Sequence, residues 1–234
     1  MALLLSIETA THACSVALHE DGKLLASSEL HMAQMAGSKL AALIEHGLES
    51  CQINPDQIHA VAISAGPGSY TGLRIGVATA KGLCYALNIP LISVNTLELM
   101  AFHVKEKILL NTNWQRSGPI LLCPMLDARR MEVYTMLLNE ELNIVKPTEA
   151  KVIDEQSFEQ ELEKGTVLFF GNGADKCRSM IRHPHAHFIT DIIPSARHMG
   201  EMASAKWREG HVENVVTFEP FYLKDFMIRK PKEA

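Results

Sequence analysis

One stretch limits the possible folds of this chain more than any other, namely residues 61–83, VAISAGPGSYTGLRIGVATAKGL. It begins with a short apolar run, Val61 to Ser64, which is typical of a buried strand. The strand cannot continue through Ala65 to Ser69, because Pro67 has no N–H and the glycines favour turn conformations. A strand that ends in a glycine-rich loop is therefore expected here.

A helix is expected after the loop, from about Thr71. Asn88 followed by Pro90 indicates where that helix ends. The next apolar run, Leu91 to Val94, reads as a second strand. Together the elements predict a βαβ unit with a right-handed crossover.

The expected helix carries an unusual number of glycines, and each one costs about 1 kcal/mol relative to alanine. Small residues recur every fourth position and so share one face: Gly72, Gly76, Ala80 and Cys84. Such a face lets another backbone approach closely. Spacing alone leaves two interpretations open, close packing on the sheet of the same domain and contact with another subunit.

The glycine loop does not match known phosphate-binding signatures. A Walker loop ends in Gly-Lys-Ser/Thr, whereas this one has Gly72-Leu73-Arg74. In a dinucleotide fingerprint the third glycine would stand at Thr71, and the strand after the helix would end in an acid rather than at Asn95. Ser69 lacks the G-x-S-x-G context of a nucleophile and is expected to cap the helix.

Composition narrows the class of protein. The 234 residues carry a formal net charge of −5, which argues against a chain that grips nucleic acid by itself. Five scattered cysteines without a C-x-x-C pair are typical of free thiols in a reducing compartment. No apolar run approaches the length of a membrane span. A soluble cytoplasmic protein is expected.

The order of predicted elements repeats. Three strands open the chain and are followed by helix, strand, helix, strand and helix: Leu3–Glu8, Ser15–His19, Leu24–Leu30, Gly37–Cys51, Val61–Ser64, Thr71–Asn88, Leu91–Val94 and Thr96–Glu106. After a polar segment at 111–118 a related order begins again: strands Ile120–Asp127, Glu132–Leu138 and Leu142–Val145, helix Asp154–Glu163, strand Thr166–Phe170, helix Ala174–Ile181, strand His187–Ile189 and helix Ser195–Glu209.

This repetition predicts an α/β chain with a duplicated ribonuclease-H-like fold, the actin-like (ASKHA) architecture, with two lobes that each start with a three-strand meander. The expected lobes are residues 1–110, with the partner interface, and residues 111–234, with the last helix packing back on the first lobe. Each lobe has an acid at the end of its first strand, Glu8 and Asp127. Across an interlobe cleft such acids could hold Mg²⁺ and a nucleotide. The simpler interpretation makes them vestigial acids hydrogen-bonded at strand ends.

The segment Ser64-Ala65-Gly66-Pro67-Gly68-Ser69-Tyr70-Thr71-Gly72-Leu73-Arg74-Ile75-Gly76 resembles the hallmark of the tRNA threonylcarbamoyladenosine biosynthesis family TsaB, also called YeaZ. Ile7-Glu8-Thr9, Leu126-Asp127-Ala128-Arg129, Val133-Tyr134 and Pro220-Phe221-Tyr222-Leu223 fit the same family order. The family usually has arginine at the position of Lys224, and lysine lacks its bidentate geometry.

The resemblance implies a non-catalytic scaffold that a TsaD-like transferase and a TsaE-like ATPase require to modify adenosine 37 of tRNAs reading ANN codons. It implies no cofactor, contact with tRNA only through the complex, and a homodimer when the transferase is absent. The expected partner surface on the first lobe consists of Leu43, Ile44, Gly72, Arg74, Gly76, Thr79 and Ala80. On this hypothesis Gly76→Leu weakens association and leaves the fold intact.

Metal chemistry has little support in the sequence. TsaD-like transferases hold a metal through His-x-x-x-His, but four residues after His31 this chain has Met35. His183, His185 and His187 alternate around Pro184, which is more typical of a surface loop. Two alternatives stay open: an actin-like small-molecule kinase, with a nucleotide between the two acids, and a metalloprotease-like protein. The role of the basic tail, 229–232, and any weak nucleotide binding also stay open.

Overall fold

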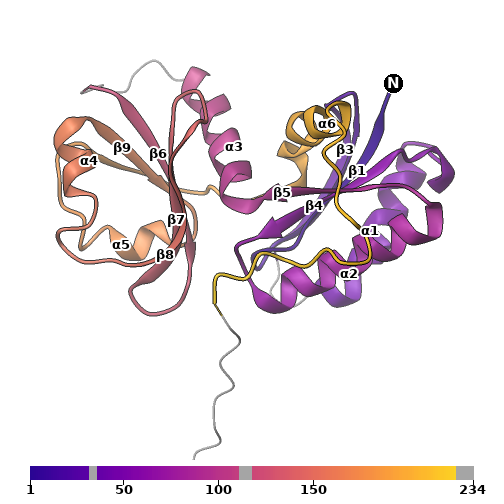
Figure 1. The fold of residues 1–234 in the computed structure, drawn as a ribbon, viewed down its shortest axis with the longest axis horizontal. Coiled ribbons are helices and arrows are strands. Elements are labelled where there is room, and N and C mark those ends of the chain that lie inside the picture. The colour runs from indigo at the N-terminus through magenta and orange to yellow at the C-terminus, as the bar shows by residue number, and fades with distance from the viewer. Residues whose placement is uncertain (32–35, 111–117, 225–234) are drawn as a thin grey trace, which may run out of the picture.

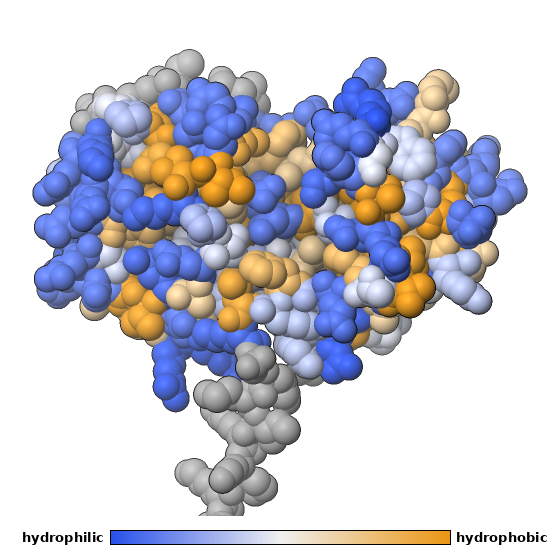
Figure 2. All heavy atoms as spheres, in the orientation of Figure 1, coloured by the Kyte–Doolittle hydropathy of each residue, from blue (hydrophilic) through white to orange (hydrophobic). Residues whose placement is uncertain are grey.

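Two five-stranded sheets form the framework of the molecule (Figure 1). In the same orientation, Figure 2 shows hydrophilic and hydrophobic residues interspersed over the surface of both lobes. The computed structural model describes residues 1–31, 36–110 and 118–224. The basic tail and Met35, which entered the sequence predictions, lie outside this range.

The first sheet has the strand order β3-β2-β1-β4-β5. Its elements are β1 (Leu3–Glu8), β2 (Cys14–Glu20), β3 (Lys23–Leu30), α1 (Ala36–Ser50), the 3₁₀ turn η1 (Pro55–Gln57), β4 (Ala60–Gly66), α2 (Tyr70–Leu87), β5 (Leu91–Asn95) and α3 (Thr96–Leu110). The meander β1–β3 is antiparallel, and β4 and β5 add to β1 in parallel.

The second sheet has the order β10-β9-β6-β7-β8. Its lobe contains β6 (Ile120–Asp127), β7 (Glu132–Asn139), β8 (Ile144–Val152), α4 (Glu159–Lys164), β9 (Thr166–Phe170), α5 (Ala174–Cys177) and β10 (Ala186–Ile189). The chain then continues into the 3₁₀ turn η2 (Ala196–His198) and α6 (Gly200–Arg208). Here too an antiparallel meander is extended by two parallel strands.

The two sheets therefore share one topology, and the predicted duplication of a ribonuclease-H-like fold is confirmed. In both lobes the first strand is central, with the meander on one side and the parallel strands on the other. Helices cover the faces of these strands, which explains why β1 and β9 are buried along their length and are apolar apart from Ser6, Glu8 and Thr166.

Several predicted boundaries in the second lobe were wrong. β8 extends to Val152, and α5 ends at Cys177. Asp154 does not cap α4: its Oδ1 accepts hydrogen bonds from the Ser157 hydroxyl (2.7 Å) and the Gln156 N–H (3.1 Å) and so closes a separate turn. Phe158, with φ of 66°, then separates this turn from the helix. The ends of short helices such as α4 are set by turn contacts of this kind, because their sequences lack a strong helical periodicity.

Helices α3 and α6 connect the two halves. Met100 and Val104 of α3 pack into the core of the second sheet, whereas Leu99 faces the first. α6 follows the second sheet in the chain, yet its N-cap residue Met199 and its Ala203 pack on the first sheet (Figure 1). The expected division at residues 110 and 111 stays a prediction, because 111–117 are outside the described range.

Residues 211–224, which we call the C-terminal strap, return along the first lobe. The N–H of Glu213 donates to the Leu91 carbonyl (2.8 Å), and the Phe221 N–H donates to the Ala65 carbonyl (2.7 Å). The Lys81 ammonium donates to the carbonyls of Val216 and Phe218, both at 3.0 Å. The strap thus joins β5, α2 and the glycine loop.

Candidate functional site

The glycine loop joins β4 to α2 and rests on the connection between β1 and β2. Ser69 is the N-cap of α2, and its Oγ accepts a hydrogen bond from the Gly72 N–H at 3.3 Å. Its own N–H donates to the Ala10 carbonyl at 2.6 Å. The prediction that Ser69 caps the helix is confirmed, as is the end at Asn88, which adopts the left-handed conformation.

The face of α2 that carries a small residue at every fourth position, from Gly72 to Cys84, is buried inside the first lobe. A Cβ on Gly72 would lie well inside van der Waals contact of the Thr9 carbonyl, and one on Gly76 would collide with the Thr9 hydroxyl. The Thr9 hydroxyl also donates to the Gly72 carbonyl at 2.8 Å. Ala80 is likewise buried, in the core beneath the helix. The glycines allow close packing of the helix on the end of β1.

The predicted partner surface needs correction for this reason. Gly72, Gly76 and Ala80 have no exposed face to offer, and Ile44 of α1 belongs to the same core. Arg74 is exposed, and Thr79 is half-buried. Leu43 is half-buried at the edge of the core.

A second set of small residues occupies the outer face of α2: Ala78, Gly82 and Ala86, which are all exposed. A Cβ on Gly82 would meet nothing within 4 Å in the described part of the chain. Beside it the Tyr85 side chain is 86% exposed. Unlike Gly72 and Gly76, Gly82 has no packing role within the described chain that offsets its cost in a helix.

Glu8, the first of the two predicted acids, does not face a solvent-filled cleft. Its side chain is completely buried at the end of β1. Oε1 accepts a hydrogen bond from the Ala10 N–H at 2.5 Å, and Oε2 has no partner among the described residues. Burial raises the pKa of Glu8 to about 7, and the nearby Ser64 hydroxyl and the Ala10 N–H offset this only in part.

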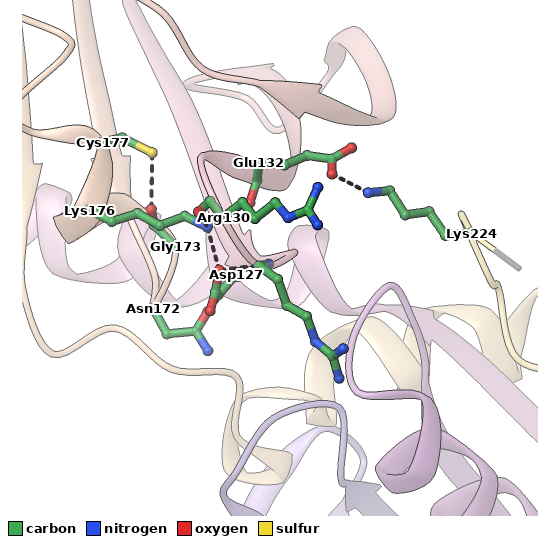
Figure 3. Close-up of polar contacts among 9 residues, drawn as sticks. Asp127, Arg130, Glu132, Asn172, Gly173, Lys176, Cys177 and Lys224 are labelled. Atoms are coloured by element: carbon green, nitrogen blue, oxygen red, sulfur yellow. Dashed lines mark hydrogen bonds and ion pairs between the residues drawn. The ribbon is translucent and has the colours of Figure 1, made fainter. Parts of the chain in front are cut away.

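Asp127, the second acid, is about half exposed and is held by groups of its own lobe (Figure 3). The Lys176 ammonium makes an ion pair with its carboxylate and also donates to the carbonyls of Arg130 (2.8 Å) and Glu132 (2.7 Å). The Arg129 N–H donates to Oδ1 of Asp127 at 3.0 Å. One acid is thus buried and the other neutralised by a lysine, so the pair lacks the open carboxylates that Mg²⁺ prefers.

The last described residue of the strap reaches this turn. Lys224 approaches from the strap and makes an ion pair with Glu132 of the second lobe (Figure 3). Just before it, the Tyr222 ring packs on that of Tyr70 at the start of α2, with 4.9 Å between the ring centroids. The sequence analysis missed the pairing of Lys176 with Asp127 and the stacking of Tyr222 on Tyr70. In both cases the partner is distant in the chain, and no local pattern indicates it.

The histidines do not build a metal centre in the part of the chain that the structure describes. No three His, Cys, Asp or Glu side chains come together there as potential ligands. His31 pairs with Glu29 at 3.0 Å, and an imidazole nitrogen of His185 lies 2.8 Å from the Leu162 carbonyl. Within the same residues, none of the helices is both long and apolar enough to cross a membrane.

Comparison with known proteins gives consistent findings. The sequence model of the family "TsaD: tRNA N6-adenosine threonylcarbamoyltransferase" matches residues 36–230. The Escherichia coli K12 protein named tRNA threonylcarbamoyladenosine biosynthesis protein TsaB is 30% identical over 229 residues, which cover 95% of this chain and 94% of that protein. The protein of the same name from Haemophilus influenzae is 27% identical and covers 95% and 93%.

Solved structures agree on the fold. A Pseudomonas aeruginosa protein described as similar to the peptidase YeaZ superposes with a TM-score of 0.81 at 24% identity, over 96% of this chain and all of that one. YeaZ from the same organism gives a TM-score of 0.77 at 24% identity, over 95% of this chain and all of that one. At this identity the likeness supports the architecture alone.

Proposed function

The chain belongs to the TsaD family and, within it, to the TsaB proteins of tRNA threonylcarbamoyladenosine biosynthesis, and from that premise we propose that it is the non-catalytic subunit that supports a TsaD-like transferase. Glu8 and Asp127 are then remnants of the fold with structural partners. A TsaE-like ATPase completes the assembly, which reaches tRNA as a complex in the cytoplasm.

The observation that carries the proposal is the outer face of α2. Gly82, at a cost of about 1 kcal/mol, keeps the surface beside Tyr85 flat where no described residue of the chain packs on it. A partner helix could approach closely over such a surface. We place the partner interface of the first lobe here, with Arg74, Thr79 and Leu43 retained from the sequence prediction. In the absence of the transferase a second copy would use the same face.

Gly82→Gln is expected to weaken association with the transferase at least tenfold. The longer side chain prevents close approach, while glutamine favours the helix more than glycine and keeps the subunit folded. Titration calorimetry with the transferase from the same source measures the loss. Glu163→Gln, at an exposed position of α4, serves as the control. Unchanged affinity of a folded Gly82→Gln protein would place the interface elsewhere.

Reconstitution tests the role itself. The purified chain and the transferase should elute together from a sizing column, and tRNA modification with the ATPase, threonylcarbamoyl donor and ATP should depend on this chain. Asp127→Asn should lower modification only modestly, through loss of the ion pair with Lys176, because the carboxylate takes no part in the chemistry. If the folded variant lost most of the modification activity, Asp127 of the second lobe would have a catalytic role, and the proposal would be wrong.

Nucleotide binding separates this proposal from a free-standing kinase. With Glu8 buried and Asp127 paired to Lys176, we expect calorimetry with Mg²⁺ and ATP to show no saturable binding by the isolated chain below about 1 mM, a weak regime on the affinity scale. Micromolar binding that Asp127→Asn abolishes would support the kinase alternative.

A further inference from the structure

The turn between β6 and β7 carries two adjacent arginines in an unfavourable backbone conformation. Arg129 has φ of 69° and Arg130 has φ of 50°, both in the left-handed region that favours glycine. Such a conformation costs a side-chain-bearing residue about 1 kcal/mol or more. Turn formation alone would favour glycine or asparagine here, so the arginine side chains call for another reason.

Other groups hold the backbone of this turn in place. The Glu132 N–H donates to the Arg129 carbonyl at 3.2 Å. The Lys176 ammonium stabilises the turn by donating hydrogen bonds to the carbonyls of Arg130 and Glu132. The ammonium therefore fixes the direction in which the two arginines leave the turn, which makes Lys176 a positioning residue.

Both arginines are exposed, and their charges are not compensated. Throughout residues 1–31, 36–110 and 118–224, no hydrogen bond or ion pair engages either guanidinium, whereas Lys176 is paired with Asp127 and Lys224 with Glu132. Four cations against two carboxylates leave a local charge of +2 on a chain whose formal net charge is −5. The local excess of positive charge lies at the tip of the turn.

Aromatic side chains precede Lys224, the strap residue that pairs with Glu132 of this turn. The strap brings Phe221, 45% exposed, and Tyr222, 37% exposed, just ahead of Lys224. In Figure 3 the Arg130 side chain extends on the side of the turn where Lys224 reaches Glu132. Guanidinium groups suit phosphate oxygens, and half-exposed rings beside basic side chains are typical of surfaces that bind single-stranded nucleic acid.

We propose that the Arg129–Arg130 turn is an RNA contact, in which the two guanidiniums bind backbone phosphates of tRNA held by the complex. This proposal rests on the proposed function, because two exposed guanidiniums on an acidic chain are too few to hold nucleic acid without the complex. RNA is favoured over an acidic protein segment by the neighbouring rings of the strap and by the RNA substrate of the pathway.

The test compares tRNA affinity of the complex across salt concentrations. Arg129→Asn/Arg130→Asn removes both charges and keeps residues that tolerate the left-handed conformation. We expect about tenfold weaker binding at 0.1 M salt and a plot of log affinity against log salt that is shallower by about 1.4 to 1.8, for two phosphates lost. Arg129→Lys/Arg130→Lys should keep most of that slope.

Arg182→Asn/Arg208→Asn is the matched control, because it removes two exposed arginine charges outside the turn. Among the described residues, their guanidiniums donate to the carbonyls of Ser179 and Ser204. It should leave affinity and slope within about twofold of the unchanged complex. If both double variants lost tRNA affinity equally, the loss would be explained by the change in net charge alone, and the proposal would be overturned.

Association of the two proteins, followed by co-elution, separates the possible failures. If the unchanged chain does not join the transferase, the proposed function fails before RNA is tested. If the complex forms and Arg129→Asn/Arg130→Asn binds tRNA normally, the RNA contact is overturned. If this variant instead loses the transferase, the arginines contact protein and the RNA proposal is wrong.

Discussion

Gly72→Ala should destabilise the protein by about 3 kcal/mol, although it adds only one methyl group to a helix. The new Cβ would overlap with the Thr9 carbonyl, a backbone atom at the end of β1 that cannot move without disturbing the sheet. Overpacking of this kind costs 1–3 kcal/mol or more, and the Thr9 to Gly72 hydrogen bond would be strained as well. Denaturant unfolding at constant slope measures the change.

Gly82→Ala is the control within the same helix, and its effect should have the opposite sign. A Cβ there meets nothing within 4 Å in the described chain, so alanine should stabilise the protein by up to about 1 kcal/mol. Equal effects at Gly72 and Gly82 would show that the inner face of α2 is not packed on Thr9.

This pair of variants also revises the expectation for Gly76→Leu. The sequence predicted a folded protein with weaker association, but the side chain would have to occupy the space of the Thr9 hydroxyl and the Ile63 methyl group. Unfolding is the expected result, and loss of association would follow from it. Gly82→Gln replaces Gly76→Leu as the test of the partner surface.

The second large effect concerns pH. Burial raises the pKa of Glu8 from 4.5, its usual value in an unfolded chain, to about 7. Between these values the folded protein keeps a proton that the unfolded chain has released, so stability falls as pH rises from about 4.5 to 7 and then levels off. The full contribution is about 3 kcal/mol, at 1.36 kcal/mol per pKa unit.

Glu8→Gln should remove this contribution and raise stability at pH 8 by about 2 kcal/mol, with little gain at pH 4.5. The amide can still accept the Ala10 hydrogen bond, and it carries no charge to bury. Denaturant unfolding of both proteins between pH 4.5 and 8 gives the difference, in which other titrating groups cancel. Glu49→Gln, at an exposed site of α1, should leave the profile unchanged. Parallel profiles for Glu8→Gln and the unchanged protein would contradict the buried ionisable carboxyl.

Both predictions concern groups in the interior of the first lobe. The Glu8 carboxyl is completely buried, and α2 packs closely on Thr9, the next residue in the chain. Both therefore belong to the internal structure of the first lobe. The surfaces that we propose for function, the outer face of α2 and the arginine turn of the second lobe, both lie outside this interior.

Local signals were sufficient for much of the fold. The cap at Ser69, the end at Asn88 and the apolar strands were all readable, because each depends on residues within one or two turns of chain. The repeated order of strands and helices also predicted the duplicated topology. Weak elements such as α4 and α5 were misplaced, because their short periodic patterns compete with turn contacts such as that of Asp154.

What the sequence alone determined is the set of elements, the family and the presence of small residues on α2. It could not decide which of two small faces is internal, since Gly72 and Gly76 recur every four residues as Ala78 and Gly82 do. That choice depends on Thr9, which lies 63 residues from Gly72 in the chain. The pairing of Asp127 with Lys176, 49 residues apart, was equally hidden. Only the tertiary structure decides such contacts, because packing brings together groups whose separation along the chain carries no local signal.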